Sequence, residues 1–297
     1  HSATDAENAA AAPVVTKVGR SGPAHSVPSA ATRQIAAPEA PPNAPEASRF
    51  AHLFHRAPRV ADPWTPDKVP YKGSKEDRTQ RTAFSRVFDN PNGTRTFESH
   101  LNPIHYQDEQ GVWQNIDCNV EPADASAQAQ GFALQNNKSS YRSYFAAKAS
   151  GFHRYELNGQ AFEFAMLDAS DVPPIVQGES VAYPEAGPGI DLQYTVLSGK
   201  LEEDIFLTRY TGQNVFRFAL KTPAGVSGRM VESGEVVFAD ASGQDLCRIP
   251  APFMYDKTWA DNHANGIDAG AESREVRLEL SQEGELLVLS VIADPLW

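Results

Sequence analysis

Histidines near the start of the chain are the first residues whose type and spacing could support chemistry. His1 could clamp copper through its amino group and its ring, but such a site needs a rigid platform beneath residue 1. His52 and His55 stand three residues apart and would share one face of a helix, where they could bind a metal. The sequence places no acidic or cysteine partner beside them, so we expect a solvated pair. We therefore predict no metal and no cofactor.

Carboxylates form the second group of candidates. Four of them lie near the ends of predicted strands: Asp191, Glu202, Glu203 and Asp204. A glycosidase needs two such groups about 5 to 9.5 Å apart, but among 38 acidic residues neighbours of this kind arise by chance. The chain also lacks the His-Glu-x-x-His, Gly-x-Ser-x-Gly and Cys-x-x-Cys motifs. We therefore predict that it is not an enzyme, with the carboxylate pair and the copper site left as alternatives.

Cys118 and Cys247 are the two cysteines of the chain, and each lies in a strand-like run. In an exported protein an even number of cysteines favours a disulfide. A bridge that closes a loop of about 130 residues would contribute about 4–5 kcal/mol to stability. We predict this bridge, and two buried free thiols are the alternative.

The charge balance limits the classes of partner. The chain has 26 Lys and Arg against 38 Asp and Glu, which gives a net charge of −12. Binding to phosphates needs a basic face, so we predict no nucleic-acid partner. The sequence also lacks an apolar run of about 18 residues, so we predict no membrane span.

The range 1–63 is rich in Ala and Pro and poor in large apolar residues, which predicts an extended or disordered arm. The chain starts without Met and shows no signal peptide, which is typical of a mature exported protein. One short run in the arm is prone to form a strand and could add to an open sheet edge of a neighbour. This predicted docking strand consists of Val14, Val15, Thr16, Lys17 and Val18.

Beyond the arm, short strands and turn signals recur. An Asn-Gly pair at 158–159 separates two alternating aromatic runs, which predicts a hairpin over 151–166. Further runs at 190–197, 215–221, 276–280 and 286–292 also alternate or end at turn residues. This pattern predicts an all-β fold built of antiparallel β-sandwiches. We expect a small β unit at 64–122, a linker or surface loop at 123–150 and a main sandwich at 151–297.

Four phrases, in order, resemble a known family. They run from Pro103 to Asp117, from Tyr183 to Val196, from Leu201 to Leu207 and from Arg248 to Asp256. Together they resemble the N-terminal β-rich region of bacterial secreted proteins of the DNRLRE-domain and RHS-repeat type, which are wall-associated and carry YD repeats. The resemblance covers about residues 80 to 297 and assigns no catalytic residue. It implies an exported bacterial module located outside the cell or at its surface.

The functional hypothesis is accordingly a non-enzymatic structural module of an extracellular assembly, whose arm docks on a neighbour through protein–protein contacts. One alternative is the N-terminal part of an RHS-like toxin shell. Another is a carbohydrate-binding surface protein, with a polysaccharide as its partner. Exposed aromatic side chains would then form the sugar platform; the candidates are Trp113, Tyr141, Tyr144, Phe145 and Trp259.

Overall fold

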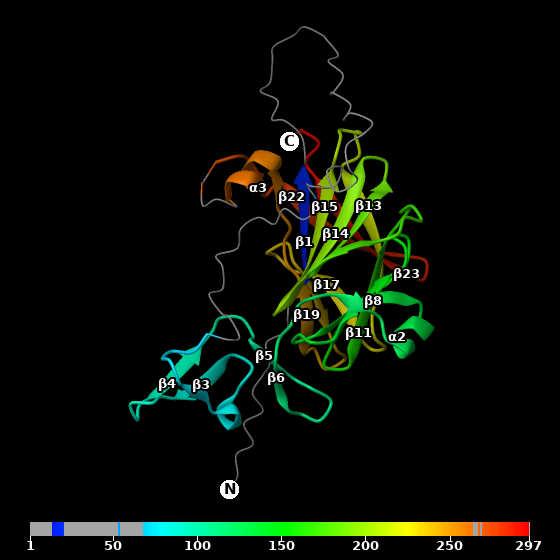
Figure 1. Cartoon of the computed structure of the whole chain (residues 1–297). Coiled ribbons are helices and arrows are strands. Elements are labelled where there is room, and N and C mark those ends of the chain that lie inside the picture. The colour runs from blue at the N-terminus through cyan, green and yellow to red at the C-terminus, as the bar shows by residue number, and fades with distance from the viewer. Residues whose placement is uncertain (1–13, 21–52, 54–67, 264–266, 268, 297) are drawn as a thin grey trace.

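Two large β-sheets pack face to face and enclose the main hydrophobic core (Figure 1). The computed structural model describes residues 14–20, 53, 68–263, 267 and 269–296. The prediction of an all-β protein with antiparallel sheets is confirmed. Alternating apolar residues cause this arrangement, because every second side chain of a strand points to the same face of its sheet.

The first large sheet has seven strands and is antiparallel except at β1. β1 (Val14–Arg20) lies between β15 (Lys200–Leu207) and β20 (Met254–Asp256), and it runs parallel to both. The other strands pair antiparallel with their neighbours: β12 (Ile175–Gln177), β13 (Ser180–Gly187), β14 (Ile190–Leu197) and β21 (Glu272–Ser273).

The second large sheet has eight strands and is antiparallel throughout. In spatial order its strands are β22 (Val276–Glu283), β23 (Leu286–Ala293), β16 (Val215–Lys221), β11 (Gln160–Met166), β10 (His153–Leu157), β9 (Arg142–Ala146), β8 (Phe132–Asn136) and β7 (Glu121–Pro122). The predicted hairpin at 151–166 is confirmed as β10 and β11. Its turn residues Asn158 and Gly159 both have positive φ, at 50° and 74°.

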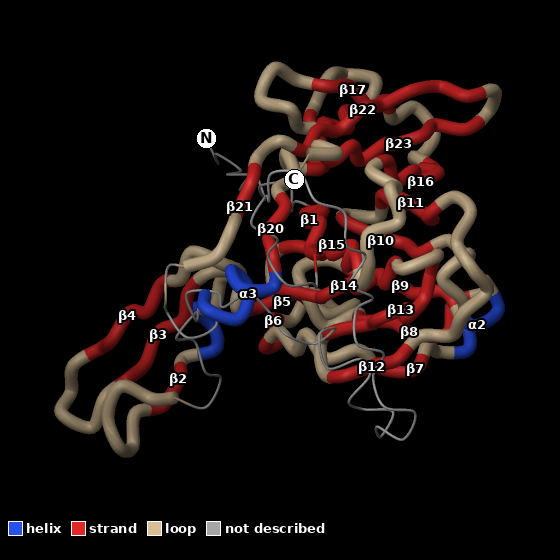
Figure 2. Tube along the Cα trace, turned by 90° about the horizontal axis from the view of Figure 1, so that it is seen from above, coloured by secondary structure: helices blue, strands red, loops and turns tan. Residues whose placement is uncertain are grey.

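Three smaller sheets complete the described strands. They consist of β17 (Ser227–Met230), β18 (Val236–Ala239) and β19 (Asp245–Ile249); β2 (Lys75–Glu76), β3 (Ser85–Asp89) and β4 (Arg95–Ser99); and β5 (His105–Gln107) and β6 (Trp113–Asn115). The helices are short: η1 (Arg78–Gln80), α2 (Ala125–Ala129) and α3 (Lys257–His263). The β2–β3–β4 sheet projects sideways from the sandwich (Figure 2).

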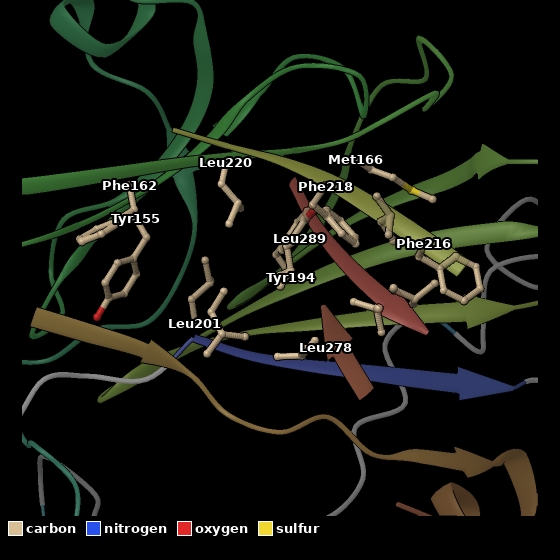
Figure 3. Packing of buried hydrophobic residues seen from close by; sticks show 14 of the residues in the cluster. Tyr155, Phe162, Met166, Tyr194, Leu201, Phe216, Phe218, Leu220, Leu278 and Leu289 are labelled. Carbon is tan, nitrogen blue, oxygen red and sulfur yellow. The ribbon is translucent and has the colours of Figure 1, made fainter. Parts of the chain in front are cut away.

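The core between the large sheets is rich in aromatic side chains (Figure 3). Tyr194 of β14 is fully buried, and its ring centroid lies 5.9 Å from that of Phe145 and 5.6 Å from that of Phe164 in the opposite sheet. Phe216 and Phe218 of β16 are also buried in this core. Contacts of this kind hold the two layers together.

The structure differs from the sequence expectation at 123–150. This range was predicted as a linker or loop, yet it contains α2, β8 and β9, and the two strands belong to the eight-stranded sheet. Phe132 and Phe145 supply the buried apolar surface that fixes these strands. The side chain of Asp124 caps α2 by accepting a hydrogen bond from the backbone N–H of Ala127 at 2.9 Å.

Candidate functional site

A polar cleft of about 540 Å³ opens at the surface where three chain segments meet. The β5–β6 hairpin contributes Tyr106 to Glu109, the β8–β9 connection contributes Asn137 to Arg142, and the β10–β11 hairpin contributes Glu156, Asn158 and Gly159. Ligand-binding clefts commonly have volumes of about 300–1,000 Å³. This cleft is therefore large enough to hold a small organic ligand.

Hydrogen bonds fix the shape of the β5–β6 hairpin at one wall of the cleft. Asp108 Oδ1 accepts from the backbone N–H groups of Gln110 at 3.1 Å and Val112 at 2.9 Å. Its second oxygen accepts from Gln114 Nε2 at 2.8 Å. These bonds, first of all the one from Gln114, lower the pKa of Asp108. The carboxylate therefore stays ionised and holds the turn around Gly111, whose φ is 75°.

The β8–β9 connection is fastened to the turn between β14 and β15. Ser140 Oγ donates to the carbonyl oxygen of Ser198 at 2.6 Å, and Ser139 Oγ lies 3.2 Å from the same oxygen. Tyr141 Oη donates to the carbonyl oxygen of Lys200 at 2.5 Å and accepts from the backbone N–H of Leu197 at 3.2 Å. The connection is therefore held in one place, and the cleft has a defined wall.

Charged groups of both signs line the cleft. Lys138 Nζ lies 2.7 Å from Glu121 Oε2, and this hydrogen bond raises the pKa of Lys138. Arg142 lies 4.0 Å from Glu156. Partial burial raises the pKa of Tyr106, so its phenol is neutral at neutral pH. The cleft thus presents cations, carboxylates and a neutral aromatic ring together, which suits a polar ligand of low net charge.

A second polar group lies inside the sandwich. His153 of β10 is fully buried, and its Nδ1 accepts from the backbone N–H of Ala146 at 3.3 Å. Its ring centroid lies 5.1 Å from that of Tyr183 and 4.7 Å from that of Tyr194. Nearby, Glu203 lines a small apolar cavity of about 40 Å³. The buried position of His153 was not predicted, although a histidine within an alternating aromatic run is a signal for a buried ring.

Three of the four carboxylates that the sequence singled out, Asp191, Glu202 and Asp204, lie on one face of the sheet, and Glu203 lies on the other. Because side chains alternate along β15, Glu202 and Asp204 share one face, whereas Glu203 points into the core beside its cross-strand neighbour Tyr194. Asp191 belongs to β14, where its Oδ1 accepts from the backbone N–H of Glu185 at 2.6 Å. Each of the four carboxylates is buried, and each interacts with other groups of the protein. They do not line the polar cleft.

The remaining candidates lie in different places. His1, His52 and His55 are outside the described residues. The predicted docking strand, Val14 to Val18, forms most of β1 and pairs within the chain's own sheet, so its docking on a neighbour stays a prediction. Within the described residues, no group of three or more His, Cys, Asp or Glu could hold a metal ion.

The predicted Cys118–Cys247 disulfide is not formed in the structure. Cys247 lies on β19 as a buried free thiol, and burial raises its pKa to about 12. Cys118 packs at the edge of the same core. Both side chains contribute apolar volume there, which is a role that does not require a bridge.

The comparisons with known proteins give distant relatives. The chain is 26% identical to the tRNA(Glu)-specific nuclease WapA of Bacillus subtilis subsp. natto over 246 residues, and this match covers 80% of the chain. It is also 26% identical over 250 residues to the tRNA nuclease WapA of Bacillus subtilis. A wall-associated protein of Geobacillus stearothermophilus is 22% identical over 230 residues, which cover 70% of this chain and 87% of that protein. No protein-family model and no solved structure matches.

These relatives fit a cell-surface protein, in agreement with the expected location. The finer resemblance to DNRLRE-domain and RHS-repeat proteins is not confirmed, because no family model matches. The chain spans about a tenth of the length of the WapA relatives that it matches. In the described part of the chain, every helix is too short or too polar to cross a membrane.

Two sequence-based predictions are contradicted by these relatives. We predicted a protein that is not an enzyme and that has no nucleic-acid partner, yet the WapA relatives are named as tRNA nucleases. The net charge of −12 did not indicate the substrate, for a physical reason. The net charge of a chain limits what its own surface attracts. The matched region is about a tenth of each WapA relative, so its charge does not determine the substrate of the whole relative.

Proposed function

We propose that the chain is a wall-associated module of a protein that cleaves tRNA. The supporting observation is the similarity to WapA nucleases over 80% of the chain. The second support comes from the wall-associated protein of Geobacillus stearothermophilus. The similar region makes up 87% of that protein, so wall association there accompanies a region like this one. Within the intact protein, we assign to this segment the contact with the cell envelope.

The geometry supports this assignment in two ways. Two large sheets enclose a continuous aromatic core, which gives the segment a rigid body. The polar cleft lies at its surface, with walls fixed by a hydrogen bond that Asp108 accepts and by hydrogen bonds that Ser140 and Tyr141 donate. A rigid body with a preorganised surface cleft suits attachment to a repeating polymer.

Cells that produce the protein offer the test of location. An antibody raised against this chain should label intact cells, and protease added outside the cells should remove the label. A cytoplasmic marker measured in parallel should survive the protease. Label that appears only after lysis, and that resists external protease, would contradict the surface assignment.

The same antibody tests the nuclease assignment. We expect the native protein, immunoprecipitated from these cells, to cleave total tRNA into discrete fragments. A precipitate from cells that lack the gene is the control. Intact tRNA after incubation with the native protein would contradict this part of the proposal, and it would leave the surface location unaffected.

A second proposal concerns β1 and retains the docking arm. β1 pairs parallel with strands on both sides, and about fifty residues separate it from β2. A chain segment of that length spans well over 100 Å when fully extended, at about 3.3 Å per residue. The strand could therefore enter the equivalent position of a neighbouring copy.

Light scattering tests this strand exchange. Concentrated, refolded protein should contain dimers, and a chain without residues 1–20 should contain none. Monomers in both samples would contradict strand exchange.

A further inference from the structure

The polar cleft is built from segments that are distant in the sequence but held together by specific contacts. The backbone N–H of Asp117, just after β6, donates to the carbonyl oxygen of Lys138 at 2.9 Å. The side-chain amide of Asn136 donates to the carbonyl oxygens of Asp117 at 2.7 Å and Asn119 at 2.8 Å. Tyr141 packs against Tyr155 of β10 with ring centroids 4.8 Å apart and the ring planes tilted. These contacts join two of the cleft's walls to the sandwich.

The lining combines hydrogen-bonding groups with two tyrosines, of which Tyr141 is buried and Tyr106 is partly exposed. Asn137 and Asn158 provide amides that both donate and accept, while Lys138 and Arg142 provide donors. Tyr106 contributes a half-buried ring. Hydroxyl groups of a sugar also donate and accept, and the C–H face of a sugar ring packs on an aromatic side chain. The lining therefore has the chemistry that a carbohydrate needs.

The charges of the lining decide between a sugar and a polyanion. Lys138 and Arg142 contribute two positive charges, while Asp108, Glu109 and Glu156 contribute three negative charges. Lys138 is paired with Glu121, and Arg142 lies near Glu156. A phosphate backbone needs an excess of positive charge. The balance here therefore favours an uncharged ligand over RNA.

We propose that this cleft binds a neutral oligosaccharide, with Tyr106 as the stacking face and with Asn137 and Arg142 as hydrogen-bonding groups. The inference rests on the proposed envelope contact, for which it names the ligand class and the site. N-acetylated amino sugars fit best, because their acetamido group adds one donor and one acceptor without adding charge. Figure 1 shows β5 and β6 lying beside the sandwich. The cleft that their hairpin helps to line is open to the surface.

Calorimetric titration with the tetramer of N-acetylglucosamine tests the proposal. We expect saturable binding by the full chain and at least a tenfold weaker affinity for Tyr106→Ala. Tyr210→Ala is the matched control, because Tyr210 is 75% exposed and lies outside the cleft. Its affinity should stay within twofold of the wild type. Thermal melting of each variant checks its folding. If Tyr106→Ala does not fold, Arg142→Gln replaces it, and we expect this variant to bind the tetramer about fivefold more weakly.

Further outcomes overturn the proposal in distinguishable ways. The chain can give no binding heat with the tetramer and still sediment with isolated cell walls. This result would refute glycan binding at the cleft, but it would leave the envelope contact standing. If the wild type, Tyr106→Ala and Arg142→Gln bind the tetramer with equal affinity, the cleft is not its binding site. Total tRNA is the second probe. Binding of tRNA that Tyr106→Ala or Arg142→Gln weakens would assign the cleft to RNA instead of sugar.

Discussion

The buried ring of His153 makes the stability of this protein sensitive to mildly acidic pH. The ring is fully buried among the aromatic side chains of Phe145, Phe164, Tyr183 and Tyr194. Its Nδ1 accepts a hydrogen bond, so the proton of the neutral ring sits on Nε2. Burial lowers the pKa of His153 from its ordinary value of 6.5 to about 3.

The sign of the effect follows from proton uptake. Below pH 6.5 the unfolded chain binds a proton at His153, whereas the folded chain stays neutral down to about pH 3. Protonation therefore favours the unfolded state, and the free energy of unfolding falls as the pH falls. Each pH unit in this window costs about 1.4 kcal/mol, so the loss between pH 7.5 and pH 4.5 is about 2.7 kcal/mol. This is a large share of the usual 5–15 kcal/mol.

His153→Asn isolates this contribution, because asparagine can still accept from Ala146 but does not titrate. Urea unfolding of both proteins at pH 7.5, 6.5, 5.5 and 4.5 gives the measurement. The variant should be less stable at pH 7.5, since it leaves a cavity. The wild type should then lose about 2.7 kcal/mol more than the variant by pH 4.5.

The other titrating groups are the same in both proteins, so their contributions cancel in the difference in free energy of unfolding between the wild type and His153→Asn. A stability difference between the wild type and His153→Asn that stays constant with pH would refute the reasoning. An NMR titration that gives the His153 ring an apparent pKa near 6.5 in the folded protein would refute it independently.

Three further predictions test the cleft wall, the thiol and the core. Tyr141→Phe removes a hydroxyl that makes two hydrogen bonds to the β14–β15 turn, and it should lower the free energy of unfolding by about 1–3 kcal/mol; an unchanged urea midpoint would contradict this. In a Cys118→Ser variant, Cys247 should react with a thiol reagent at pH 8 only after unfolding, because burial raises its pKa to about 12; rapid labelling of the folded protein would contradict this. Phe216→Ala should cost about 3–5 kcal/mol in urea unfolding, and a loss below 1 kcal/mol would mean that the ring is not in the core.

Local signals in the sequence predicted much of the sandwich. The runs 190–197 and 215–221 coincide with β14 and β16. The Asn-Gly pair at 158–159 predicted its hairpin because both residues readily adopt positive φ. These features depend on neighbouring residues, so one sequence is enough to reveal them.

Features that depend on distant partners were not predictable. β1 runs parallel to β15 and β20, and their residues are separated by well over a hundred positions, so alternation within each strand could not indicate the pairing. The range 123–150 reads as polar, yet Phe132 and Phe145 anchor it in the sheet. The polar cleft joins three segments that no local pattern connects. Tertiary packing determined each of these features.

Sedimentation with isolated bacterial cell walls tests the central claim most directly. The purified chain is mixed with washed walls, the walls are pelleted, and the chain is quantified in both fractions. The envelope contact predicts that most of the chain enters the pellet, and that excess soluble wall fragments return it to the supernatant. A chain that remains in the supernatant at every wall concentration, while an unrelated wall-binding protein pellets, would contradict the account.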